Sequence, residues 1–179
     1  MENFIKFLYN KNPLLILSYL SKNIYQENTV SNISKELNLS VGSVHTILKK
    51  FEQAGLVTGR TLGKNVIYEL DKNNPILKPF RTFDNINGIF PIIEAIKPFS
   101  RKIILFGSCA RGEDTVNSDI DLFILADEKK EKINEIIDLA KASRQINPVI
   151  VGTIEFMELE KNDKVFFEEI MKGIVLWEV

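Results

Sequence analysis

The segment Gly107-Ser108-Cys109-Ala110-Arg111-Gly112, followed by Ser118-Asp119-Ile120-Asp121-Leu122, holds the residues that decide the fold and the chemistry. Residues 119–125 read as a strand, in which alternate side chains point to the same face. Asp119 and Asp121 therefore project together, while Ile120, Leu122 and Ile124 face the core. Two neighbouring carboxylates repel each other and are costly to bury unpaired. A divalent cation relieves that cost, and Mg²⁺ favours one or two carboxylates plus phosphate oxygens.

The turn at Gly107-Ser108 is predicted to lie where a strand over residues 102–106 passes into a short helix. Glycine lets backbone approach a ligand closely, and exposed N–H groups at such a turn can bind phosphate. Arg111 offers a planar cation that suits phosphate, or a pair with Glu113 or Asp114. A phosphate-binding turn beside two carboxylates suggests metal-assisted transfer of a nucleotidyl group. One metal would polarise the α-phosphate, and a second could activate the attacking oxygen.

The elements around this segment alternate between strands and helices. A linker is expected over residues 72–86, where Asn73-Asn74-Pro75 and Pro79 interrupt any periodicity. Further strands are expected at 149–153 and 174–177, and helices at 87–97, 128–142 and 165–172. This alternation predicts an α/β (α+β) domain with one mixed sheet over residues 87–179.

Glycine-serine, ten residues, then Asp119-Ile120-Asp121 resembles the signature of the DNA polymerase beta-like nucleotidyltransferases, especially their minimal prokaryotic members. The resemblance covers residues 87–179 and includes Ala110-Arg111-Gly112 and Ser118. It implies a nucleotidyltransferase fold in which Asp119 and Asp121 hold Mg²⁺ (or Mn²⁺) and Gly107-Ser108 hold the triphosphate of an NTP, with ATP the expected nucleotide. Minimal members transfer AMP to a partner toxin, and others act on antibiotics or nucleic-acid ends.

One departure from that family concerns a third carboxylate on the strand after the intervening helix. Here the stretch from Asn147 to Thr153 contains no Asp or Glu, and Glu155 beyond it lies in the wrong register for a direct replacement. The departure places catalysis in question more than it does nucleotide and metal binding.

The first 71 residues predict a winged helix-turn-helix. Val30, Ile33 and Leu37 recur at helical spacing after the capping residue Thr29. A second helix after Ser40 ends near Gly55, and two strand-like runs at 56–61 and 65–70 form a hairpin. The pattern resembles the DNA-binding module of many prokaryotic regulators.

The polar side of the second helix is expected to enter a major groove, and cations of the wing are expected to meet phosphate. The candidate DNA-binding residues, all within residues 29–70, are Ser43, His45, Thr46, Lys49, Lys50, Arg60 and Lys64. The alternative is a winged helix used only for interaction or dimerisation, and a homodimer is expected by analogy.

Composition restricts the remaining classes. The net charge is -1 over 179 residues, while residues 1–71 hold eight Lys and Arg against six Asp and Glu. That small excess permits DNA binding without proving it. The single cysteine, Cys109, allows no internal disulfide or multi-cysteine zinc site and fits a reducing cytoplasm. No apolar run approaches membrane-spanning length, so no membrane partner is expected.

Three functional hypotheses follow. The first is a Mg²⁺-dependent nucleotidyltransferase that moves NMP from an NTP to a hydroxyl. The second is a DNA-binding regulator that senses nucleotide without turning it over, which the missing carboxylate motivates. The third is an antitoxin-like partner of a toxin protein. The plain structural alternatives are a solvated strand edge at Asp119 and Asp121, an ordinary turn at Gly107-Ser108, and a surface ion pair at Arg111.

Overall fold

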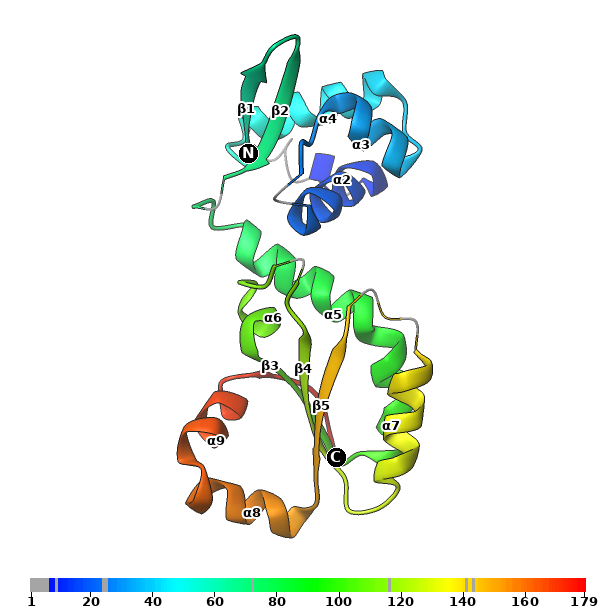
Figure 1. Ribbon diagram of the computed structural model, residues 1–179, viewed down its shortest axis with the longest axis vertical. Coiled ribbons are helices and arrows are strands. Elements are labelled where there is room, and N and C mark those ends of the chain that lie inside the picture. Colours follow the sequence, from blue (N-terminus) through cyan, green and yellow to red (C-terminus); the bar gives the residue numbers. More distant parts are fainter. Residues whose placement is uncertain are drawn as a thin grey trace. The chain divides into compact units, whose positions relative to one another are not determined.

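The chain forms two compact units, Met1–Leu77 and Lys78–Val179 (Figure 1). The computed structural model describes residues 7–8, 10–23, 26–71, 73–115, 117–140, 142 and 144–179. Within these residues, none of the helices is both long and apolar enough to cross a membrane.

In the part of the first unit that the structure describes, the helices α2, α3 and α4 are followed by a hairpin. Two of its helices begin at side-chain caps, because Thr29 accepts a hydrogen bond from the N–H of Asn32 and Ser40 accepts one from that of Ser43. The antiparallel strands meet at Leu62 and Asn65, where Gly63 adopts a φ of 60°. The elements are α2 (Lys11–Lys22), α3 (Val30–Leu37), α4 (Val41–Gln53), β1 (Val57–Leu62) and β2 (Asn65–Leu70).

The second unit is built on a four-stranded mixed sheet of order β5-β4-β3-β6. β3 pairs antiparallel with β4 and β6, whereas β4 and β5 run parallel. The strands are β3 (Lys102–Phe106), β4 (Ile120–Leu125), β5 (Ile146–Val151) and β6 (Ile174–Glu178). The helices are α5 (Leu77–Ile96), η1 (Lys97–Phe99), α6 (Gly107–Arg111), α7 (Lys130–Leu139), α8 (Thr153–Asn162) and α9 (Lys164–Met171). The predicted mixed α+β class is confirmed.

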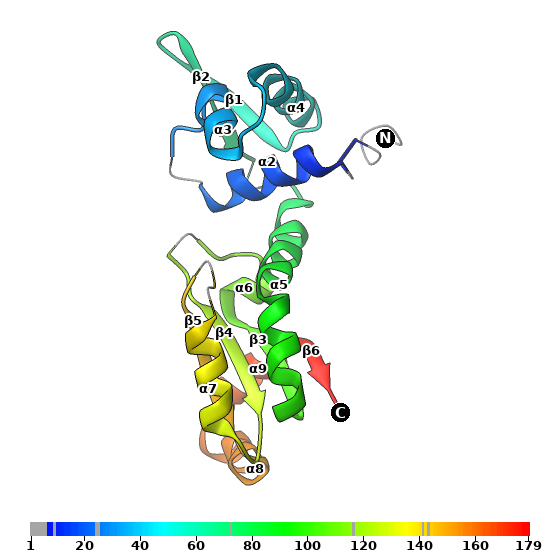
Figure 2. The ribbon, with the colours of Figure 1, turned by 90° about the vertical axis from the view of Figure 1, so that its right-hand side faces the viewer.

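Helices cover both faces of this sheet (Figures 1 and 2). On the face of α5 and α7, Ile93, Leu105 and Ile133 belong to one buried cluster. On the face of α8 and α9, Phe123 and Ile170 belong to a second one. β4 is therefore apolar on both sides along most of its length, and Asp121 stands near its first residue, on the same side as Phe123.

Two predicted boundaries need correction. The helix expected at 87–97 starts at Leu77, so most of the predicted linker 72–86 is helical. Pro79 lies in the first helical turn, where the missing N–H has no partner to lose. The strand expected at 149–153 starts at Ile146, before Pro148. β5 is an edge strand of the sheet, and such strands tolerate proline. Helix α8 was not anticipated.

A buried polar cluster ties the segment after α6 to α5 and to the start of β5. Asp114 accepts hydrogen bonds from Asn85 Nδ2 at 3.0 Å and from Arg144 Nη1 at 2.7 Å. Arg144 Nη2 also donates to Asn85 Oδ1 at 2.7 Å, and Arg81 lies 3.6 Å from the Asp114 carboxylate. One acid thus balances two nearly buried arginines.

We expect Asp114→Ala to lower the free energy of unfolding of this unit by about 3 kcal/mol, because it leaves Arg144 and Arg81 without their anion. The fluorescence of Trp177, the only tryptophan, reports this unit during urea unfolding. Asp138→Ala, at an exposed position of α7, is the matched control and should change the midpoint little. Equal midpoints for the two variants would contradict a structural role for the cluster.

Candidate active site

The last residue of β3 and the first residues of β4 lie together at one end of these two central strands. Phe106 is the register partner of Asp121, so the turn that begins at Gly107 lies directly beside that carboxylate. Gly107 has a φ of 69°, which side-chain-bearing residues rarely adopt. A Cβ at this position would also collide with Oδ2 of Asp121. Only glycine therefore allows the turn and the carboxylate to approach this closely.

The two aspartates lie as the alternation predicts. Asp119 and Asp121 are both partly exposed, and Ile120 between them is 2% exposed and belongs to the core. Cys109 Sγ donates to the backbone carbonyl of Asp119 at 3.2 Å, which fixes the segment before β4 against α6. Burial raises the pKa of the Cys109 thiol, as suits a packing residue rather than a nucleophile.

Asn147 is a site residue that sequence reasoning missed. In the parallel pairing of β4 with β5 it is the register partner of Asp121, and its Nδ2 donates to Asp119 Oδ2 at 3.0 Å. Gln145 Nε2 donates to Asn147 Oδ1 at 3.3 Å and orients the amide. An amide therefore lies on the neighbouring strand beside both carboxylates. The signal was present in the sequence, but it depends on the register of β5, which the proline obscured.

The negative charges around Asp121 favour the binding of a cation at this end of β4. Burial raises the pKa of the Asp121 carboxyl, and the charges of Asp119 and Glu169 raise it further, against the hydrogen bond from Asn147 and the charge of Arg111. A carboxyl that is costly to ionise beside another acid gains from a neighbouring positive charge. Glu169, on α9, is a second residue that the sequence did not point to.

Arg111 is engaged with acids at the surface. It lies 3.0 Å from Glu113 and 3.8 Å from Glu169, and its side chain is about half exposed. The predicted pair with Glu113 is present, whereas Asp114 pairs with Arg144 and Arg81 instead. Ser108 is partly exposed on the same short helix. Contact of either side chain with phosphate stays a prediction.

The side-chain oxygens at this site fit a cation whose remaining ligands are phosphate oxygens or water. Among the described residues, no group of three or more His, Cys, Asp or Glu side chains is placed to hold a metal ion. Two carboxylates and an amide oxygen from Asn147 are hard oxygen ligands, which Mg²⁺ accepts together with phosphate and water. Glu155 does not join them, because it binds the N–H of Gly152 and Lys130 at the far end of β5.

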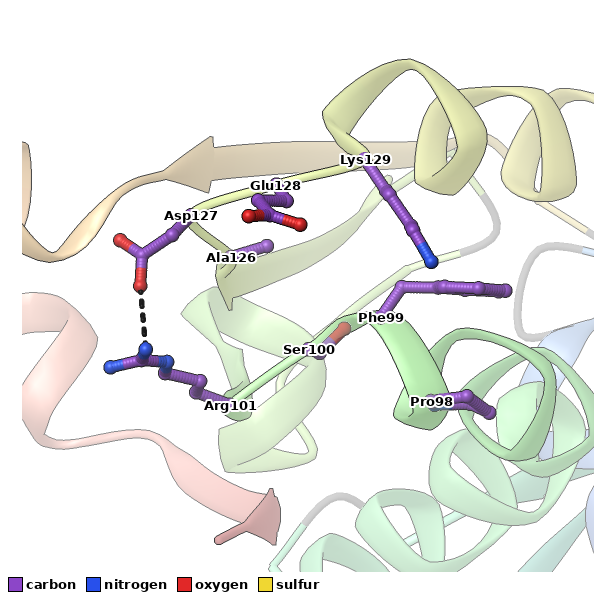
Figure 3. Close-up of a pocket in the computed structure, with 8 residues that line it drawn as sticks. All are labelled: Pro98, Phe99, Ser100, Arg101, Ala126, Asp127, Glu128 and Lys129. Atoms are coloured by element: carbon purple, nitrogen blue, oxygen red, sulfur yellow. Dashed lines mark ion pairs between the residues drawn. The ribbon is translucent and has the colours of Figure 1, made fainter.

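A polar pocket of about 280 Å³ lies at the opposite end of β3 and β4 (Figure 3). Arg101 and Asp127 face each other across it at 3.2 Å. Lys129 lies 5.4 Å from the ring centroid of Phe99. None of the predicted site residues lines this pocket.

Comparison with known families identifies both units. A polymerase beta nucleotidyltransferase model matches residues 92–179. A winged helix-turn-helix DNA-binding model matches residues 9–58. The chain joins a winged helix-turn-helix domain to a polymerase beta-type nucleotidyltransferase domain. No curated protein matches it.

Several solved structures resemble part of the chain. Reduced HlyU from Vibrio cholerae is 28% identical over 39% of this chain and 70% of its own, with a TM-score of 0.34. AF1382 from Archaeoglobus fulgidus is 26% identical over 50% of this chain and 96% of its own, with a TM-score of 0.36. A third structure is the homodimeric winged helix-turn-helix DNA-binding domain of a possible ArsR-family regulator from Mycobacterium bovis. It is 21% identical over 47% of this chain and 74% of its own, with a TM-score of 0.39.

In the winged helix-turn-helix domain, the predicted DNA-contacting side chains are mostly exposed. Ser43 is partly buried, and the remainder are open to solvent, namely His45, Thr46, Lys49, Lys50, Arg60 and Lys64. Several already have partners within the domain. Lys49 pairs with Glu52 at 2.7 Å, Arg60 lies 3.6 Å from Glu69, and Lys50 lies 4.4 Å from the ring centroid of Phe7. The positive charge on this surface is therefore partly balanced.

We expect Gly107→Ala in the nucleotidyltransferase domain to weaken Mn²⁺ binding at least about tenfold, measured with a non-hydrolysable ATP analogue. The added Cβ displaces the Asp121 carboxylate, and the positive φ adds strain of about 1–3 kcal/mol. Gly88→Ala, in α5 with open space around it, is the control and should bind Mn²⁺ as the wild type does. Unchanged affinity in Gly107→Ala would show that the close approach does not serve the cation.

Proposed function

We propose that the nucleotidyltransferase domain transfers NMP from an NTP, with ATP the expected nucleotide, to a hydroxyl acceptor, and that the protein acts at DNA. The observation that carries the proposal is the close approach of the Gly107 turn to Asp121, with Asp119 beside it. A glycine turn whose backbone lies against one of two paired carboxylates suits a cation-bound triphosphate better than any purely structural role.

Each residue has a separate task in this proposal. Asp119 and Asp121 hold Mg²⁺ or Mn²⁺, which neutralises charge on the α-phosphate when it is bound. Gly107 and Ser108 hold the triphosphate, and Arg111 binds a phosphate oxygen while it keeps its pairs with Glu113 and Glu169. The acceptor oxygen bonds to the α-phosphorus, the bond to pyrophosphate breaks, and the hydroxyl proton passes to solvent. The protein contributes mainly position and electrostatic stabilisation.

The winged helix-turn-helix domain would place α4 in a major groove and its wing along the phosphate backbone. His45 and Thr46 lie on the exposed side of α4, and Lys64 lies at the tip of the wing. Because Lys49 and Arg60 have acidic neighbours in the free protein, DNA must draw them away from those acids. The net contribution of each is therefore smaller than that of an unpaired cation.

Asn147 favours a second candidate function, a regulator that binds nucleotide without rapid turnover. An amide in register with Asp121 supplies no charge to activate an attacking hydroxyl. In this version the nucleotide changes the affinity of the winged helix-turn-helix domain for DNA. A gel shift on upstream DNA with and without ATP and Mg²⁺, with product analysis on the same samples, separates the two functions.

We expect transfer of label from α-labelled ATP to an acceptor hydroxyl to require both aspartates. Asp119→Asn and Asp121→Asn should each lower the rate at least about a hundredfold, because each removes an anionic ligand of the cation. Asp138→Asn on the exposed side of α7 is the control. Label transfer that survives both substitutions would remove the assignment.

We expect DNA affinity to fall with rising salt, and Lys64→Ala to reduce the slope of log K against log[salt] by about one. The reason is that Lys64 would neutralise one phosphate from the wing. Lys172→Ala, which removes the same charge from the nucleotidyltransferase domain, should leave the slope unchanged. If the protein does not bind DNA even at low salt, the proposal that the winged helix-turn-helix domain binds DNA is wrong.

A further inference from the structure

Asn147 lies beside both carboxylates of the proposed nucleotide site. It is in register with Asp121, and its amide N–H donates to Asp119. A half-turn of this amide about its Cβ–Cγ bond would exchange the N–H for the carbonyl oxygen. The side chain can therefore stabilise the two carboxylates in the free site, or supply one neutral oxygen to a bound cation.

Among the described residues, no group of three or more His, Cys, Asp or Glu side chains is placed to hold a metal ion, so the anionic ligands here are Asp119 and Asp121. Glu169 acts on Asp121 through its charge, but it pairs with Arg111, as Glu113 does, and Glu155 is bound at the other end of β5. One divalent cation balances the charges of Asp119 and Asp121. A second cation about 3.5–4 Å away would be repelled by the first, and an amide offers no charge to offset that repulsion.

We propose that Asn147 limits the site to a single divalent cation, the one that accompanies the triphosphate. This inference rests on the proposed nucleotide site. The cation of the nucleotide draws most of its oxygen ligands from phosphate and needs only the two aspartates. The position on the acceptor side stays without a cation, so the attacking hydroxyl receives no activation there.

The same amide lets the domain fold without any cation. Its N–H satisfies Asp119 Oδ2 at 3.0 Å, which offsets part of the repulsion between the carboxylates. A carboxylate at position 147 would be nearly the same size but would place a third negative charge beside Asp119 and Asp121. The folded domain would then be less stable without metal.

The test counts Mn²⁺ in the full-length protein with a non-hydrolysable ATP analogue by electron paramagnetic resonance. Wild type and Asn147→Ala should show the signal of isolated Mn²⁺. Asn147→Asp should show the coupled signal of a Mn²⁺ pair. In chelator, the unfolding temperature of Asn147→Asp, followed by Trp177 fluorescence, should fall by about 5 °C and recover when Mn²⁺ is added. Asn134→Asp, at an exposed position of α7, is the matched control.

A coupled pair in the wild type or in Asn147→Ala overturns the inference, as does an isolated signal in folded Asn147→Asp. Should Asn147→Asp fail to fold, the wild-type and Asn147→Ala spectra still decide, because both must show isolated Mn²⁺. Failure of the wild type to bind either Mn²⁺ or the analogue removes the proposed function itself, which is a different result from a wrong count.

Discussion

The contact between the Gly107 turn and the Asp121 carboxylate is the constraint on which the rest of the second unit depends. It exists because β3 and β4 pair antiparallel with Phe106 opposite Asp121. A shift of this register by one residue would turn Asp121 toward the apolar cluster on the face of α5 and α7, and Leu122 toward the cluster on the opposite face. The apolar residues on both faces of β4 therefore hold the carboxylate in place, since any slip would point a carboxylate into an apolar cluster. The same register of β3 and β4 is therefore needed both for the packing of the core and for the position of Asp121.

The chain connecting the turn to the carboxylates is held just as firmly. Asp114, Arg144 and Asn85 form a nearly buried network between the segment after α6, the start of β5 and α5. Such a network repays the desolvation of its charges only when every member is satisfied. Arg144 lies two residues before β5, the strand that carries Asn147. The network thus positions Asn147 as well as the loop.

The local parts of this arrangement could be predicted from sequence, and the non-local parts could not. Gly107, Asp119 and Asp121 stand out because their spacing and strand context are contained within fifteen residues. Asn147 becomes visible only when β5 is paired with β4, and Pro148 made that strand appear to begin later. Glu169 lies on α9, whose approach to Arg111 follows from packing on the sheet. The early start of α5 was missed because Pro79 resembles a helix breaker except in a first turn.

The amide at position 147 also bears on why a nucleotide site should accompany a DNA-binding domain. A nucleotide alters DNA affinity only if it binds two states of the protein differently. Rapid transfer would destroy the bound nucleotide and shorten that effect, whereas a site with one cation would retain it. Arg111 would supply a local difference between states, because it contacts Glu113 and Glu169 in the free domain and would also contact phosphate in the bound one. On these proposals the two candidate functions would differ in rate more than in architecture, and the charge at position 147 would set that rate.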